Sequence, residues 1–204
     1  FDRAEQTSPD PAVTRVRVAQ SLAGAGEKDR ALAKAQASLG SVNAAPLARA
    51  LLVRLYVEKG QPDLAERELQ AAISAAPQDT TPLLNLARFY MTQRRPADAV
   101  APLERAATLS PTQAEPLALL VDVHLVLGQK DRVVATGERL LRVQGETPAA
   151  YLIFAIINEK VDRPAEAMEA YQRVLDKEPG QLVAARGRAR LLERQQRVPE
   201  ALRL

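Results

Sequence analysis

Few side chains in this sequence could carry out catalytic chemistry. The chain has one histidine, His124, and no cysteine, which excludes disulfides, thiolate zinc sites and cysteine nucleophiles. Gly24 and Gly26 precede no Lys-Ser pair, so they do not form a phosphate-binding loop. The acidic residues stand mostly singly among arginines, which is typical of solvated helix faces rather than of paired catalytic carboxylates. We therefore predict a protein that is not an enzyme and that uses neither a metal ion nor a cofactor.

The arginines offer a different chemistry, the recognition of carboxylates. Arg186, Arg190 and Arg194 are spaced four residues apart and therefore share one face of a helix. A guanidinium group can bind a carboxylate through two parallel hydrogen bonds. The net charge of +3 is concentrated in this part of the chain, because residues 182–204 hold six arginines against two glutamates. The sequence therefore predicts a cationic end on an otherwise nearly neutral protein.

Composition narrows the classes of partner. Nucleic-acid binding favours a continuous cationic surface with aromatic side chains, whereas only 3% of the residues are aromatic, so we predict no nucleic-acid partner. The longest apolar run, residues 149–157, is far shorter than the about 20 residues of a membrane span. Because the chain begins with Phe1 rather than methionine, we expect it to be a piece of a longer protein.

These side chains belong to a sequence that repeats every 34 residues. Pro77, Pro111 and Pro179 are spaced 34 and 68 residues apart, and Pro62, Pro96 and Pro164 have the same spacing. The twentieth position of the repeat is small throughout: Ala31, Ala65, Ala99, Val133, Ala167 and Ala201. The copies occupy residues 12–45, 46–79, 80–113, 114–147 and 148–181, with a partial copy at 182–204. A fixed period of this length is typical of a repeat architecture.

Each copy reads as two helices joined by a tight turn. It contains two apolar-periodic stretches that are long enough for globular helices. The fifteenth position carries Gly26, Gly60 and Gly128, and glycine favours the left-handed residue that ends a helix. Proline at the seventeenth position suits the first turn of the next helix. An unrelated antiparallel helical bundle would not produce the fixed period, and no stretch alternates as a strand does.

The pattern resembles the tetratricopeptide repeat (TPR) family over residues 12–204. The third copy shows the match well, with Leu86, Ala87, Tyr90, Ala99, Leu103, Ala106 and Pro111 at the family's positions. The tryptophan that is common at the fourth position of the family is absent. The resemblance implies an all-α fold, a right-handed superhelical solenoid of about five and a half repeats. Residues 1–11 would form a lead-in and residues 12–204 a single domain.

In TPR proteins the first helices of the repeats line a concave groove, which identifies candidate binding residues here. The resemblance assigns positions 2, 5, 9, 12 and 13 of each copy to the groove. The candidates are Arg54, Leu84, Arg88, Ala118, Asp122, Leu152, Ile156, Arg186, Arg190 and Arg194. They predict a trough that is apolar in the middle, deepest near Ala118 and flanked by arginines, which suits a protein or peptide with acidic groups. Alternatively, the large apolar residues pack between repeats and the arginines are simply solvated.

Two departures from the family pattern bear on function. Chaperone adaptors clamp a carboxylate with a lysine and an asparagine at positions 5 and 9, where the second copy has Ala50 and Arg54. The clamp is therefore missing. In the fourth copy, Gly137 replaces a bulky core residue, and we expect a packing gap and a flexible joint there.

The sequence leaves three functions open. The first is a non-catalytic protein-interaction scaffold. The second is a docking or regulatory segment of a larger bacterial envelope machine, such as exopolysaccharide export or pilus assembly, or of an enzyme whose catalytic part lies elsewhere. The third is self-association. The chain has 22 arginines and 6 lysines, a bias typical of GC-rich bacteria, and the likeness to envelope arrays favours the bacterial periplasm without identifying the compartment.

Overall fold

The computed structural model describes residues 8–202, and every regular element in that range is a helix. The predicted all-α class is therefore confirmed. Residues 1–7, most of the expected lead-in, and residues 203–204 lie outside the described part of the chain. The chain divides into two compact units, one ending at Arg94 and one beginning at Arg95, and each is considered by itself.

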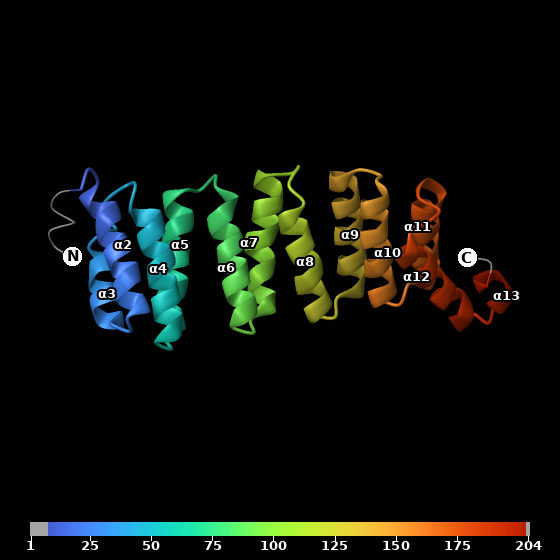
Figure 1. The fold of residues 1–204 in the computed structure, drawn as a ribbon, viewed down its shortest axis with the longest axis horizontal. Coiled ribbons are helices and arrows are strands. Elements are labelled where there is room, and N and C mark those ends of the chain that lie inside the picture. Colours follow the sequence, from blue (N-terminus) through green and yellow to red (C-terminus); the bar gives the residue numbers. More distant parts are fainter. Residues whose placement is uncertain (1–7, 203–204) are drawn as a thin grey trace. The chain divides into compact units, whose positions relative to one another are not determined.

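Unit 1 contains two helical hairpins and one further helix. Its helices are α2 (Pro11–Gly24), α3 (Lys28–Gln36), α4 (Ala45–Glu58), α5 (Pro62–Ala75) and α6 (Thr80–Thr92). Each helix packs against the next one along the chain, and α2 also contacts α4 (Figure 1). The first helices of the first two copies, α2 and α4, therefore lie side by side.

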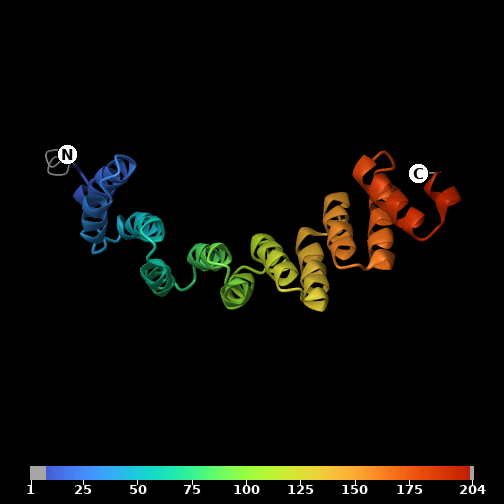
Figure 2. The same cartoon turned by 90° about the horizontal axis from the view of Figure 1, so that it is seen from below.

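Unit 2 continues the same pattern. Its helices are α7 (Pro96–Leu109), α8 (Glu115–Val126), α9 (Lys130–Gln144), α10 (Pro148–Lys160), α11 (Pro164–Lys177), α12 (Leu182–Arg194) and the short α13 (Val198–Ala201). Consecutive helices are again in contact, and α10, α11 and α12 lie side by side in both views (Figures 1 and 2).

The turns inside the hairpins follow one backbone rule. Proline occupies the first turn of α5, α7 and α11, as predicted. The residue at the fifteenth position has a positive φ in all six copies: Gly26 (82°), Gly60 (69°), Arg94 (57°), Gly128 (67°), Asp162 (61°) and Gln196 (61°). Glycine adopts this conformation without steric cost, whereas other L-residues do not. In three copies the turn is therefore made by a residue other than glycine, for which a positive φ is less favourable.

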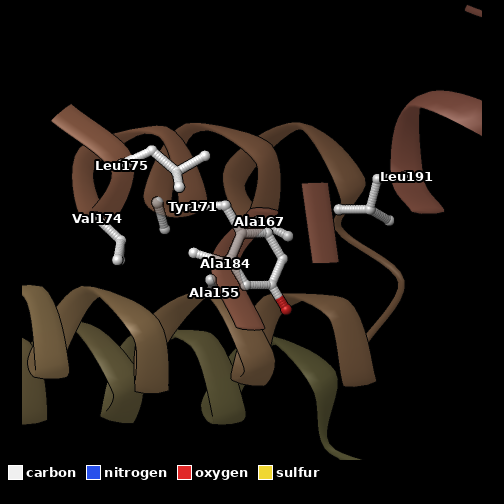
Figure 3. Close-up of a cluster of buried hydrophobic side chains, with 8 residues drawn as sticks. Ala155, Ala167, Tyr171, Val174, Leu175, Ala184 and Leu191 are labelled. Atoms are coloured by element: carbon white, nitrogen blue, oxygen red, sulfur yellow. The ribbon is translucent and has the colours of Figure 1, made fainter. Parts of the chain in front are cut away.

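Small residues let the two helices of a copy approach closely. The alanines at the twentieth position of copies one, two, three and five, such as Ala65 and Ala167, are fully buried. In unit 2 a cluster of buried apolar side chains from α10, α11 and α12 surrounds Tyr171, whose ring is 1% exposed (Figure 3). The ring lies against the backbone of α12 at Gly187, where an added Cβ would stand 2.7 Å from both Cε2 and the hydroxyl oxygen of Tyr171. Glycine is required at this close approach.

The expected packing gap at Gly137 is absent. A Cβ added there would lie 3.3 Å from Cγ2 of Ile157 and 3.4 Å from Cδ2 of Phe154. Side chains of α10 therefore occupy the space that a bulky residue at position 137 would fill in the family pattern. His124 is 2% exposed, and its Nδ1 lies 2.9 Å from Oε1 of Gln129. It is a core residue, as predicted.

Candidate functional site

One candidate site is a pocket of about 580 Å³ in unit 1, formed by α4, α5 and α6. The repeat frame explains its position, because α4 contributes Ala50, Arg54, Val57 and Glu58 and α6 contributes Arg88 and Thr92, all at positions that the resemblance assigns to the groove. Val53, Leu69 and Phe89 add apolar surface. The first helices therefore form an apolar trough with polar groups around it.

The charges around this unit 1 pocket largely satisfy one another. Arg49 Nη1 lies 2.9 Å from Glu68 Oε2, with both side chains about one-fifth exposed. Arg54 Nε lies 4.0 Å from Glu58 Oε1, and Lys28 Nζ lies 2.9 Å from Glu58 Oε2. The hydrogen bond from Lys28 lowers the pKa of the Glu58 carboxyl below its usual value. Arginines 49, 54 and 88 face Glu58, Glu68 and Asp79, so the pocket presents no net formal charge.

Unit 2 carries two adjoining pockets. The larger, of about 550 Å³, lies between α10, α11 and α12 and is lined by Ile156, Glu159, Lys160, Tyr171, Val183, Arg186, Gly187 and Arg190. The smaller, of about 220 Å³, lies between α8 and α10 and includes Ala118 and Asp122. Ile156 and Lys160 line both pockets. We call the two pockets together the unit 2 surface.

A network of hydrogen bonds fixes one side of the larger pocket. Arg190 donates from Nε and Nη2 to Glu159 Oε1, at 2.9 and 2.7 Å, and from Nη2 to Oε2 at 2.9 Å. The hydroxyl of Tyr171 donates to Glu159 Oε2 at 2.9 Å. Burial raises the pKa of Tyr171 to about 12, and the hydrogen bond to Glu159 and its negative charge act in the same direction. The phenol therefore stays neutral near physiological pH and ties α11 to α10.

The ten candidate residues divide among these surfaces. Arg54 and Arg88 line the unit 1 pocket, whereas Ala118, Asp122, Ile156, Arg186 and Arg190 line the unit 2 surface. Leu84 is only 5% exposed, and Leu152 packs against the cluster around Tyr171. Arg194 is exposed but binds Asp162 Oδ1 at 3.2 Å. None of these last three lines a described pocket.

Neighbouring side chains limit the volume of the pocket at Ala118. The pocket at Ala118 is the smallest of the three described above, because Ile153, Ile156 and Ile157 of α10 occupy the space beside the alanine. Leu152 stands at the same position of its copy as Ala50 and Ala118. Its longer side chain reaches the neighbouring core, whereas the alanines leave an opening.

Several pocket residues were not among the candidates. Lys160 and Val183 stand at positions 13 and 2 of their copies, so extending the groove assignment to every such position would have identified them. Val53 stands at position 8, which the sequence pattern assigns to helix packing, and Phe89 at position 10 carries no comparable signal.

The described residues offer little support for other kinds of site. Over residues 8–202, no group of three or more His, Asp or Glu side chains could hold a metal ion. A search of the same range finds no helix with the length and apolar character needed to cross a membrane.

Comparison with known proteins identifies the repeat independently. A sequence model of the tetratricopeptide repeat matches residues 50–114 and 159–204, together more than half of the chain. Among solved structures, MamA is 23% identical, with a TM-score of 0.58, and the match covers 74% of this chain and 89% of MamA. YrrB, described as a TPR protein with an unusual peptide-binding site, is 19% identical, with a TM-score of 0.56 and coverage of 90% and 94%.

PilW, described as a widely conserved type IV pilus biogenesis factor, is 17% identical, with a TM-score of 0.58 and coverage of 96% of this chain and 91% of PilW. At these identities the structural matches establish the fold alone. No curated protein sequence matches the chain.

Proposed function

Because the chain belongs to the tetratricopeptide repeat family, we propose that it is a non-catalytic scaffold that holds a segment of a partner protein on the first helices of its repeats. The observation that carries the proposal is the unit 1 pocket, whose volume of about 580 Å³ lies within the roughly 300–1,000 Å³ range of binding pockets. Its walls are largely apolar, and two of its three arginines, Arg49 and Arg54, pair with glutamates that also line it.

The pocket suits an extended or helical peptide that inserts an apolar side chain between α4 and α6. Ala50 and Val53 leave room above α4, and Phe89 provides an apolar wall on α6. Peptide recognition of this kind draws its affinity from a few buried anchor residues, while the polar rim fixes orientation. YrrB shares the fold and is described as having a peptide-binding site, which supports the same use of the surface here.

Selection of short random peptides displayed on phage against the chain tests the proposal. Ala50→Glu places a charge and added bulk inside the unit 1 pocket, at an exposed helical position. Ala33→Glu makes the same change at an exposed position of α3 that lines no described pocket. We expect selected peptides that lose about tenfold or more in affinity with Ala50→Glu and bind Ala33→Glu normally. Peptides that bind both variants equally would place recognition outside this pocket.

The wider setting is a separate proposal, in which the chain serves as a docking segment of a bacterial envelope machine. PilW, a pilus biogenesis factor, has the same fold, and this shared fold is the support. We expect cross-linking in the source cells to recover identified envelope proteins with the intact chain and not with Ala50→Glu. Recovery of cytoplasmic enzymes alone would favour a regulatory segment of an enzyme, and recovery of the chain alone would favour self-association.

A further inference from the structure

We propose that the unit 2 surface is a second docking site, specific for an acidic peptide segment that carries apolar side chains. This inference rests on the proposed scaffold function and assigns a partner chemistry to a surface separate from the unit 1 pocket. It depends on three observations: cations without a partner among residues 8–202, exposed apolar side chains beside them, and a rigid support beneath them.

Charge distinguishes this surface from the unit 1 pocket. The unit 2 surface is lined by Lys160, Arg186 and Arg190; Asp122 is the carboxylate of the smaller pocket, and the larger pocket has a single carboxylate, Glu159. Arg190 and Tyr171 already bind both oxygens of that carboxylate. Within residues 8–202, neither Lys160 nor Arg186 makes an ion pair or a side-chain hydrogen bond. Two positive charges are therefore available to a ligand at the opening of the pocket, whereas the unit 1 pocket has no net charge.

Apolar side chains are exposed beside these cations. Ile153 is 38% exposed, Ile156 is 37% exposed and Val183 is 53% exposed. Single exposed apolar residues are common on soluble proteins, but here three line two adjoining pockets. A ligand that covered them would gain from burial of apolar surface. Exposed apolar side chains beside cations favour a ligand that has both apolar side chains and carboxylates.

The support beneath the surface is held in place from three helices. Gly187 lets the ring of Tyr171 lie against α12, and the hydroxyl of Tyr171 fixes Glu159 of α10. Glu159 in turn holds Arg190 of α12. Figure 3 shows the Tyr171 hydroxyl directed away from the buried cluster that surrounds the ring. A surface that is already ordered loses little conformational entropy when a ligand binds.

An acidic peptide fits this surface better than a nucleic acid does. Phosphate backbones are bound along extended cationic tracks, and single strands also require aromatic side chains on which bases stack. Here the free cations stand beside isoleucine and valine side chains, and the single aromatic ring of the pocket, Tyr171, is 1% exposed. We therefore assign the site to a peptide in which aspartates or glutamates flank a large apolar residue.

The same phage selection, carried out with the full chain, tests the inference. The diagnostic variant is Lys160→Glu/Arg186→Glu, which reverses both free charges. Its matched control is Lys130→Glu/Arg132→Glu, with the same change of charge at exposed positions of α9 that line no described pocket. Because exposed ion pairs each contribute modestly to binding, we expect acidic peptides to bind the diagnostic variant about tenfold more weakly. The control variant should bind them within about twofold of the unmodified chain.

Each other outcome would overturn the inference. Selected peptides without acidic residues would refute the assigned chemistry. Acidic peptides that weaken equally with both charge variants would indicate non-specific attraction. Peptides affected only by Ala50→Glu would support the proposed scaffold function while removing the second site. Single-stranded DNA that displaces acidic peptides from the surface would identify a nucleic-acid site instead, and a selection that enriches no peptide would refute both proposals.

Discussion

At the left-handed turn inside each hairpin, we expect a substitution to glycine to raise stability and a substitution from glycine to alanine to lower it. At Arg94, whose φ is 57°, the backbone pays about 1–2 kcal/mol for a left-handed L-residue. Glycine removes this cost, but it also gives the unfolded chain more conformational freedom, which lowers the stability of the folded state by about 0.5–1 kcal/mol. Arg94→Gly should therefore stabilise the protein by about 0.5–1 kcal/mol. The arginine is exposed and makes no side-chain hydrogen bond or ion pair with the described residues, so no such interaction is lost.

Gly60→Ala should have the reverse effect. The φ of Gly60 is 69°, and an added Cβ would meet no atom within 4 Å. The whole cost therefore comes from the backbone, and we expect a loss of about 1 kcal/mol. Gly40 is the matched control, because its φ is not positive and its Cβ position is also open. Gly40→Ala should leave stability unchanged or raise it by about 0.4–1 kcal/mol through the unfolded chain.

Thermal unfolding followed by circular dichroism measures all three variants. For a chain of this size, about 1 kcal/mol corresponds to a change of about 2–4 °C in Tm. Because repeat arrays can unfold in parts, amide hydrogen exchange of α4 and α5 should confirm that Gly60→Ala acts on its own hairpin. A lower Tm for Arg94→Gly, or an unchanged Tm for Gly60→Ala, would refute the backbone explanation of the glycine column.

Three further predictions concern the network around Tyr171. Gly187→Ala forces a Cβ against the Tyr171 ring, so an overpacking cost of about 1–3 kcal/mol should exceed the gain of about 1 kcal/mol in helix propensity. Urea unfolding would detect the lower free energy of unfolding. Adding Tyr171→Phe should not restore stability, because ring carbons make the clash. In an absorbance titration one tyrosine should ionise near pH 12, and Tyr171→Phe should abolish that step. Because folding raises this pKa above its usual value of 10.0, the contribution to stability is complete below pH 10 and is lost as the pH rises through 12. Glu159→Gln removes the negative charge beside Arg190 but keeps an oxygen that can accept its hydrogen bond, so acidic peptides should bind about threefold more tightly, measured by fluorescence anisotropy. Weaker binding would contradict the assigned chemistry.

The hairpins could be predicted from sequence because their determinants are local and repeated. Proline at the start of a helix and glycine at its end act through their own backbone angles. Only three of the six residues at the fifteenth position are glycine, however. Aspartate tolerates the left-handed conformation better than most residues, but at Arg94 and Gln196 the side chain gives no sign of it, so the turn is predictable there only through the repeat frame.

Residues that face the groove were harder to predict, because the length of the side chain determines whether it lines a pocket or packs against the core. Ala50, Ala118 and Leu152 share position 5 of their copies. The two alanines line pockets, whereas Leu152 packs against the Tyr171 cluster. A position in the repeat fixes the direction of the Cβ atom, but the length of the side chain and the shape of the next copy decide what it contacts.

A charged side chain is available to a ligand only where it forms no ion pair within the protein. The repeat determines many of these ion pairs. Arg163 binds Asp131, Arg190 binds Glu159 and Arg194 binds Asp162, each with a partner about one repeat earlier. The residues 31 and 32 positions before Arg186 are Ala155 and Phe154, which cannot neutralise it. An arginine with no acidic residue one repeat earlier on its face is therefore the one to test for ligand binding. By this reasoning, the acid preference that we propose for the unit 2 surface depends on Arg186 and Lys160 rather than on the total number of arginines.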